Sequence, residues 1–120
     1  MTGARRFLVV EDEYLIAVLI EEYLDDLEHQ VAAVAATLGE ALEQARVGNF
    51  DAALLDLQLG GAASYGVADI LTQRGIPFAF VTGRAEGDVQ PAYAAVPMLC
   101  KPFRPDDFAA IIARLLAPNG

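Results

Sequence analysis

The sequence predicts an α/β fold in which five parallel strands form one sheet with helices on both faces. Short apolar runs of strand length alternate along the chain with longer segments of helical period, which is the pattern of repeated βαβ units. Three of the five runs are apolar throughout, as expected of strands that helices cover on both faces. We therefore expect a doubly wound (βα)5 sheet, and in such sheets ligands bind beyond the carboxyl ends of the strands.

The expected strands and helices alternate over the whole chain. The apolar runs predict strands at residues 7–10, 30–34, 52–55, 78–81 and 98–100. A first helix is expected over residues 14–28, because apolar residues recur at 15, 16, 19, 20, 23, 24 and 27. Thr37 and Glu40 have the spacing of a capping box, which predicts that a second helix begins there and runs to about residue 46.

The later helices have stop and start signals of their own. A third helix is expected over residues 64–73, and Gly75 and Pro77 would end it. Pro105 and two acidic residues form the first turn expected for a last helix that ends near residue 116. Between residues 83 and 97 the chain holds two glycines and two prolines, so the fourth helix should be short or irregular.

Size and composition indicate one globular domain over residues 1–120, without an output domain. The 120 residues are 55% hydrophobic and 21% charged, with a net charge of −9. This acidity argues against nucleic-acid binding. No apolar run approaches the roughly 18 residues that span a bilayer, and nothing resembles a signal peptide. A single cysteine suits a reducing cytoplasm, so we expect a cytoplasmic protein without nucleic-acid or membrane partners.

Polar residues follow four of the expected strands at their carboxyl ends. Glu11 and Asp12 follow the first strand, Asp56 the third, Thr82 the fourth and Lys101, the only lysine, the fifth. Each has an ordinary explanation alone, as a helix-start acid, a turn residue or a solvated lysine. Together they place carboxylates, a hydroxyl and an ammonium at one edge of the sheet. Carboxylates that converge favour a hard cation such as Mg²⁺, and the ammonium and hydroxyl suit a phosphoryl group.

Four segments resemble a known family in their order and spacing. "FLVVEDE", "LLDLQLGG", "FVTG" and "LCKPF" are similar to the receiver (CheY-like) domain of two-component response regulators. The resemblance implies that Asp56 accepts a phosphoryl group from the phosphohistidine of a histidine kinase or a histidine phosphotransfer protein. It also implies that Thr82 and Lys101 contact this group. The Mg²⁺ ligands that it implies are Glu11, Asp12, Asp56 and the backbone carbonyl of Gln58.

One position departs from the receiver pattern. Receivers usually carry Tyr or Phe three residues before the lysine, and here this residue is Met98. A thioether has no ring that could swing between two discrete places. The segment "PFAFVTGR" resembles the FAT GUY subgroup of receivers, which lack the aromatic switch and often work with HWE-type sensor kinases. Our hypothesis is that switching is an order–disorder change in residues 83–97.

Four further residues are candidates for a functional role. Arg84 lies two residues after Thr82, so it either pairs with the phosphoryl group or points into solvent. Cys100 is expected to be a small core residue rather than a redox group. His29 is expected at the surface or at a helix C-cap. Val18 lies among acidic residues of the first helix, and the resemblance makes this helix a contact for the kinase.

Two other functions stay open from the sequence. A Mg²⁺-dependent phosphatase with an Asp nucleophile commonly has an acid two residues after it, where this chain has Gln58. A degenerate receiver would act only as a protein-interaction module, although the five site positions all carry competent side chains. We therefore expect a signalling phosphoacceptor rather than an enzyme, a monomer or weak dimer that acts on a downstream protein.

Overall fold

The computed structural model describes residues 3–83 and 89–117, which contain a five-stranded parallel sheet. Its strands lie side by side in the order β2-β1-β3-β6-β7. The chain therefore first winds to one side of β1 and then continues on the other, which places helices on both faces. The expected doubly wound sheet is confirmed. The strands are β1 (Arg6–Val10), β2 (Gln30–Ala35), β3 (Ala52–Asp56), β6 (Phe78–Thr82) and β7 (Met98–Cys100).

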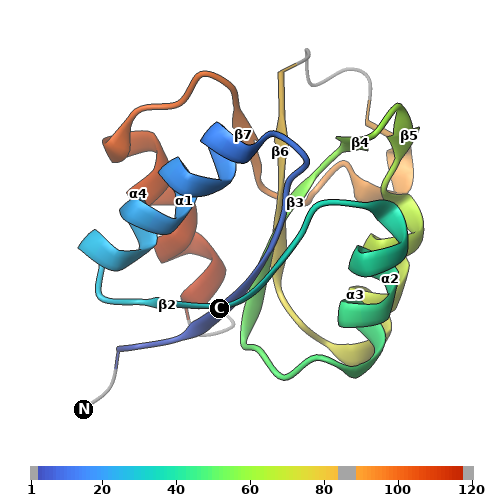
Figure 1. Cartoon of the computed structure of the whole chain (residues 1–120), viewed down its shortest axis with the longest axis horizontal. Helices are drawn as coiled ribbons and strands as arrows, with labels where there is room; N and C mark the ends of the chain where they lie inside the picture. The colour runs from blue at the N-terminus through green and yellow to red at the C-terminus, as the bar shows by residue number, and fades with distance from the viewer. Residues whose placement is uncertain (1–2, 84–88, 118–120) are drawn as a thin grey trace.

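Four α-helices in the described part of the chain cover the two faces of the sheet. Helices α1 (Tyr14–Asp26) and α4 (Pro105–Leu116) lie on one face, and α2 (Leu38–Val47) and α3 (Tyr65–Arg74) lie on the other (Figure 1). Between β6 and β7 the described residues form only a 3-10 turn, η2 (Pro91–Tyr93). The expectation of a short or irregular fourth helix is met for residues 89–97, and residues 84–88 lie outside the described part. None of these helices has the length and apolar character needed to cross a bilayer.

Each face of the sheet has its own apolar core, as the alternation of side chains along a strand requires. Phe7, Val9 and Leu54 face α1 and α4, where they pack with buried residues such as Phe108. Leu8, Val10 and Leu55 belong to the opposite core, with the small buried residues of α2 and α3, namely Ala41, Ala45 and Ala68. Alanines at these positions let the two helices lie close to the sheet.

The prediction that the apolar stripe of α1 is buried is wrong at its first residue, Leu15. Leu15 and Tyr14 are both 78% exposed, whereas Ala17, Ile20 and Leu24 are buried. Only three residues separate the carboxyl end of β1 from Tyr14, so the first turn of α1 lies at the edge of the sheet and has no strand to pack on. An exposed apolar pair consequently lies beside the carboxyl edge.

A short hairpin after β3 was not expected from the sequence. Strands β4 (Gln58–Leu59) and β5 (Ala62–Ala63) pair antiparallel through the turn residues Gly60 and Gly61. Both glycines have positive φ angles, 60° and 85°, as a two-residue turn of this type needs. The Gly-Gly pair is the sequence signal that predicts such a hairpin. The hairpin turns the chain back over the carboxyl edge of the sheet.

Candidate functional site

Strand register aligns the expected site residues at one edge. Val10 pairs with Leu55 across β1 and β3, so Glu11 and Asp56 follow on adjacent strands. Asp56 in turn pairs with Val81. Thr82 pairs with Cys100, and the N–H of Lys101 donates to the carbonyl of Thr82 at 2.7 Å. The convergence that the sequence predicted is therefore present in the fold.

Three acidic side chains converge closely enough to share a cation. Glu11, Asp12 and Asp56 each offer a carboxylate oxygen, and these oxygens lie within 4.8 Å of one another. Glu11 and Asp56 are buried, whereas Asp12 is exposed and opens the cluster to solvent. Glu11 Oε1 is buried and accepts no hydrogen bond from the described residues, although the Lys101 ammonium lies 3.1 Å away as an ion-pair partner. A hard divalent cation such as Mg²⁺ fits this set, because it would neutralise the carboxylates and can complete its shell with water.

Backbone N–H groups of the β4–β5 hairpin hold two of these carboxylates. The N–H of Gln58 donates to Asp56 Oδ1 at 3.2 Å. The N–H of Gly60 donates to Asp12 Oδ2 at 3.0 Å, which joins residues 48 positions apart in the sequence. The hairpin that the sequence analysis missed is thus part of the candidate metal site.

Lys101 lies at the centre of the acidic cluster. Its ammonium nitrogen is 3.1 Å from Glu11 Oε1 and 3.4 Å from Asp56 Oδ2. A third partner, Glu13 Oε1, lies 3.2 Å away and was not identified from the sequence. Glu13 stands directly after the recognised acidic pair, and only the fold shows that its side chain turns toward Lys101. The lysine side chain is 17% exposed, so the interactions are partly desolvated.

Burial and charge change the acidity of two groups in the cluster. Burial raises the pKa of the Asp56 carboxyl from 3.8 to about 7, and the charge of Glu11 adds to the rise, which Lys101 and the Gln58 N–H oppose. Burial lowers the pKa of Lys101, but the hydrogen bond to Glu11 and the charges of Asp56 and Glu11 outweigh it and raise the pKa above 10.5. Lys101 is therefore a permanent cation. Ionised Asp56 needs further positive charge, which a divalent cation would supply.

Two buried hydroxyl residues complete the edge. Thr82 is 2% exposed at the end of β6. Ser64, which precedes α3, is fully buried, and its hydroxyl donates to the carbonyl of Asp56 at 2.7 Å and to that of Leu57 at 3.3 Å. Sequence reasoning missed Ser64, since a Ser before a helix usually indicates only an N-cap. These hydrogen bonds hold the backbone of Asp56 in place.

Aromatic rings fill the region where most receivers carry the switch residue. Met98 is half-buried against the core of the α2–α3 face. Tyr93 stacks on Tyr65 with ring centroids 5.5 Å apart and meets Phe80 edge-on at 5.8 Å. The Tyr93 hydroxyl also donates to the carboxylate of Asp69 in α3. Aromatic packing is therefore present here, but residues of α3, β6 and η2 supply it.

Three of the four further candidate residues lie in the described part of the chain. Cys100 is exposed, so the expectation of a core position is wrong. It is the last residue of β7, which is an edge strand. The N–H of His29 caps α1 by donating to the carbonyl of Leu24 at 2.9 Å, while its half-buried ring accepts from the N–H of Arg5 at 3.0 Å. Val18 is half-buried, and Arg84 lies outside the described residues.

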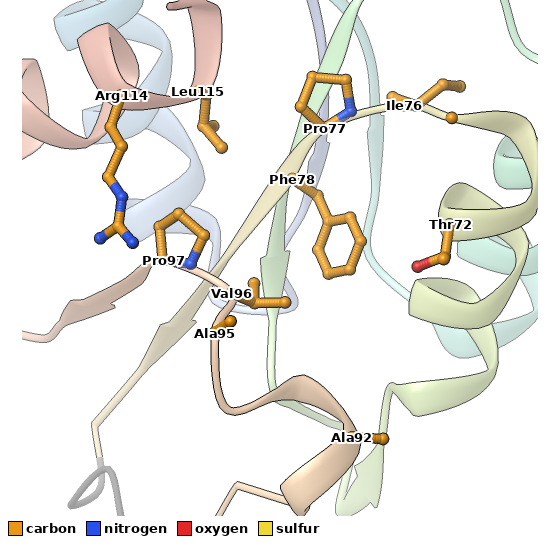
Figure 2. A pocket seen from close by; sticks show the side chains of 11 residues that line it. Thr72, Ile76, Pro77, Phe78, Ala92, Ala95, Val96, Pro97, Arg114 and Leu115 are labelled. Atoms are coloured by element: carbon orange, nitrogen blue, oxygen red, sulfur yellow. The ribbon is translucent and has the colours of Figure 1, made fainter. Parts of the chain in front are cut away.

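An open groove lies away from the acidic cluster. It has a volume of about 520 Å³, and Phe78, the first residue of β6, lies in it. Figure 2 shows Phe78 and Thr72 on one side and Arg114 and Pro97 on the other, with Val96 between them. Among the described residues that line the groove, none is acidic. The carboxyl edge is therefore the better candidate for chemistry.

The fold and the cluster define a class of protein. A doubly wound sheet whose carboxyl edge joins a buried aspartate, two further acids, a threonine and a lysine is the arrangement of phosphoacceptor receivers. Residues 7–113 match the model of the response regulator receiver domain family. The chain belongs to this family of two-component signalling domains, which is what the sequence motifs predicted.

Relatives of known structure support this assignment. The chain is 38% identical to SdrG from Sphingomonas melonis Fr1, with a TM-score of 0.85 over 98% of this chain and all of that one. It is 32% identical to the anti-anti-sigma factor PhyR from Bartonella quintana, with a TM-score of 0.78 over 97% of this chain and 49% of that one. It is also 32% identical to the phyllosphere-induced regulator PhyR of Methylorubrum extorquens. This match covers 94% of the chain but only 44% of that PhyR. The FAT GUY interpretation is consistent with PhyR-like relatives.

Proposed function

We propose that Asp56 accepts a phosphoryl group from the phosphohistidine of a sensor histidine kinase, of the HWE type, or of a histidine phosphotransfer protein. The observation that carries this proposal is the Asp56 carboxylate itself. It is buried, lies 3.4 Å from the Lys101 ammonium and belongs to a trio of acids whose oxygens lie within 4.8 Å of one another. Mg²⁺ would be held by Glu11, Asp12, Asp56 and the backbone carbonyl of Gln58.

The transfer makes and breaks one bond at phosphorus. An oxygen of Asp56 attacks, the new P–O bond forms and the P–N bond breaks, and the imidazole leaves with the bonding electrons and takes up a proton. Lys101 neutralises charge on the phosphoryl oxygens, and the Thr82 hydroxyl donates a hydrogen bond to one of them. Bound Mg²⁺ would supply further charge neutralisation at the same oxygens. The chain itself provides the nucleophile, its burial and its orientation through Ser64 and Gln58.

The signal would leave the site through Thr82 and the following segment. The N–H of Gln90 donates to the Tyr65 hydroxyl at 3.0 Å, and Tyr93 binds Asp69, so α3 holds residues 89–97 through two hydrogen bonds. We propose that phosphorylation changes the order of residues 83–97, and that this change replaces the movement of an aromatic switch residue at position 98. Amide hydrogen exchange with and without beryllofluoride tests this output route. Unchanged protection over residues 83–97 would argue against it.

The phosphoacceptor function is tested by mass spectrometry of the intact protein. Incubation with acetyl phosphate and Mg²⁺ should add the mass of one phosphoryl group to the wild type and none to Asp56→Asn. A wild type that gains no mass in the presence of Mg²⁺ would instead be an interaction module. Steady turnover of many phosphoesters would indicate a phosphatase rather than a signalling phosphoacceptor.

The partner is proposed from the relatives. One PhyR is named an anti-anti-sigma factor, and we propose that this chain likewise controls a downstream regulatory protein in the cytoplasm, as a monomer or weak dimer. Light scattering with and without beryllofluoride measures the oligomeric state. A stable dimer in both conditions would contradict a monomeric or weakly dimeric protein.

A further inference from the structure

The ammonium of Lys101 has as many acidic partners as it has protons to donate. An ammonium carries three N–H donors, and Lys101 Nζ lies near Glu11, Glu13 and Asp56. Its N–H groups donate to Glu11 Oε2 at 3.3 Å, to Glu13 Oε1 at 3.2 Å and to Asp56 Oδ2 at 3.4 Å. A phosphoryl oxygen on Asp56 can therefore bind Lys101 only if one carboxylate gives up its contact.

Exposure decides which contact is released most easily. The side chains of Glu11 and Asp56 are 0% and 7% exposed, whereas that of Glu13 is 64% exposed. Water can solvate the Glu13 carboxylate as soon as it leaves Lys101. The buried Glu11 carboxylate has no comparable access to water, so its separation from the cation is more costly. Asp56 carries the phosphoryl group itself and stays beside the cation. Glu13 is thus the partner that an arriving phosphoryl group replaces.

We propose that Glu13 is a positioning residue that holds Lys101 before phosphorylation and competes with the phosphoryl group for it. The inference rests on the proposed phosphoacceptor function. Glu13 acts through Lys101, because the contact of its carboxylate in the described structure is with the ammonium. It would set how tightly the site holds a phosphoryl group.

The local structure makes this role separable from folding. The backbone N–H of Glu13 donates to Glu11 Oε2 at 3.0 Å, and its carbonyl accepts from the N–H of Ala17 at 3.0 Å. The side chain makes no cap hydrogen bond to α1. Replacing Glu13 by Gln keeps both backbone bonds and the side-chain length while it removes the charge.

The test measures the affinity for beryllofluoride, a noncovalent mimic of the phosphoryl group, in the presence of Mg²⁺. Glu13→Gln should bind it about 2- to 5-fold more tightly than the wild type. This is the change in affinity that corresponds to the free energy of an exposed ion pair. The gain should shrink in 1 M NaCl, because salt screens the Glu13–Lys101 attraction. Glu22→Gln is the matched control, since Glu22 is exposed in α1 and carries the same charge.

A spectroscopic measurement distinguishes positioning from a general effect on the fold. The side-chain NMR signals of Lys101 should shift in Glu13→Gln and stay in place in Glu22→Gln. Equal affinities in the two variants, or a gain that 1 M NaCl does not reduce, would refute the competition and leave the phosphoacceptor function intact. A wild type that binds no beryllofluoride would overturn the proposed function and this inference with it.

Discussion

Ionisation of the buried Asp56 carboxyl should lower the free energy of unfolding of the metal-free protein at neutral pH. Burial and the neighbouring Glu11 raise the pKa of Asp56 to about 7 in the folded protein. In the unfolded chain this carboxyl titrates near 3.8. The folded state therefore binds the proton more tightly, and stability is lost as the pH rises from about 4 to about 7. Asp56→Asn, which resembles the protonated acid, should remove this loss.

The pKa difference sets the size of the effect. Each pKa unit corresponds to about 1.36 kcal/mol, so a rise from 3.8 to about 7 would amount to about 4 kcal/mol. The site is open to water at Asp12 and can rearrange around an ionised carboxylate, which reduces this figure. We expect Asp56→Asn to raise the free energy of unfolding at pH 8 without Mg²⁺ by about 2 to 4 kcal/mol. At pH 4 the two proteins should differ by less than about 1 kcal/mol.

Urea unfolding in the presence of a chelator, followed by circular dichroism between pH 4 and pH 8, measures this difference. Asp25→Asn is the control, because Asp25 is exposed in α1 and its loss should change stability little at any pH. Added Mg²⁺ should stabilise the wild type more than Asp56→Asn. A difference between wild type and Asp56→Asn that stays constant with pH would refute the argument from burial.

Three further substitutions test the packing around the site. Ser64→Ala removes a buried hydroxyl that donates to the carbonyl of Asp56 and should lower the free energy of unfolding by about 1 to 3 kcal/mol; a neutral result in urea would show that water replaces it. Phe108→Ala empties a fully buried position of α4 and should cost about 3 to 5 kcal/mol in the same assay, whereas a loss below about 1 kcal/mol would mean that the core collapses into the gap. Tyr93→Phe keeps the ring but loses the bond to Asp69. It should destabilise the protein by about 0.5 to 1.5 kcal/mol and speed amide exchange in residues 89–97, and unchanged exchange would contradict a tether there.

Much of the fold could be predicted from the sequence because it depends on local patterns. Apolar runs bounded by turn residues located the five strands, and Thr37 with Glu40 located the start of α2. The Thr37 hydroxyl indeed accepts from the N–H of Glu40 at 3.1 Å. The sequence pattern predicted buried positions for Leu15 and Cys100, and both are exposed. Helical period and apolar character do not determine where a sheet ends.

By itself, the sequence determined the order of the five sheet strands and the four α-helices, the family and which residues lie beyond the strand ends. These follow from short-range periodicity and from the rule that parallel strands share one carboxyl edge. Only the tertiary structure decided that Glu13 turns toward Lys101, that Gly60 holds Asp12 and that the Ser64 hydroxyl donates to the carbonyl of Asp56. Each of these contacts joins residues far apart in the chain or depends on the direction of one side chain. Such contacts follow from how the layers pack, which no local pattern records.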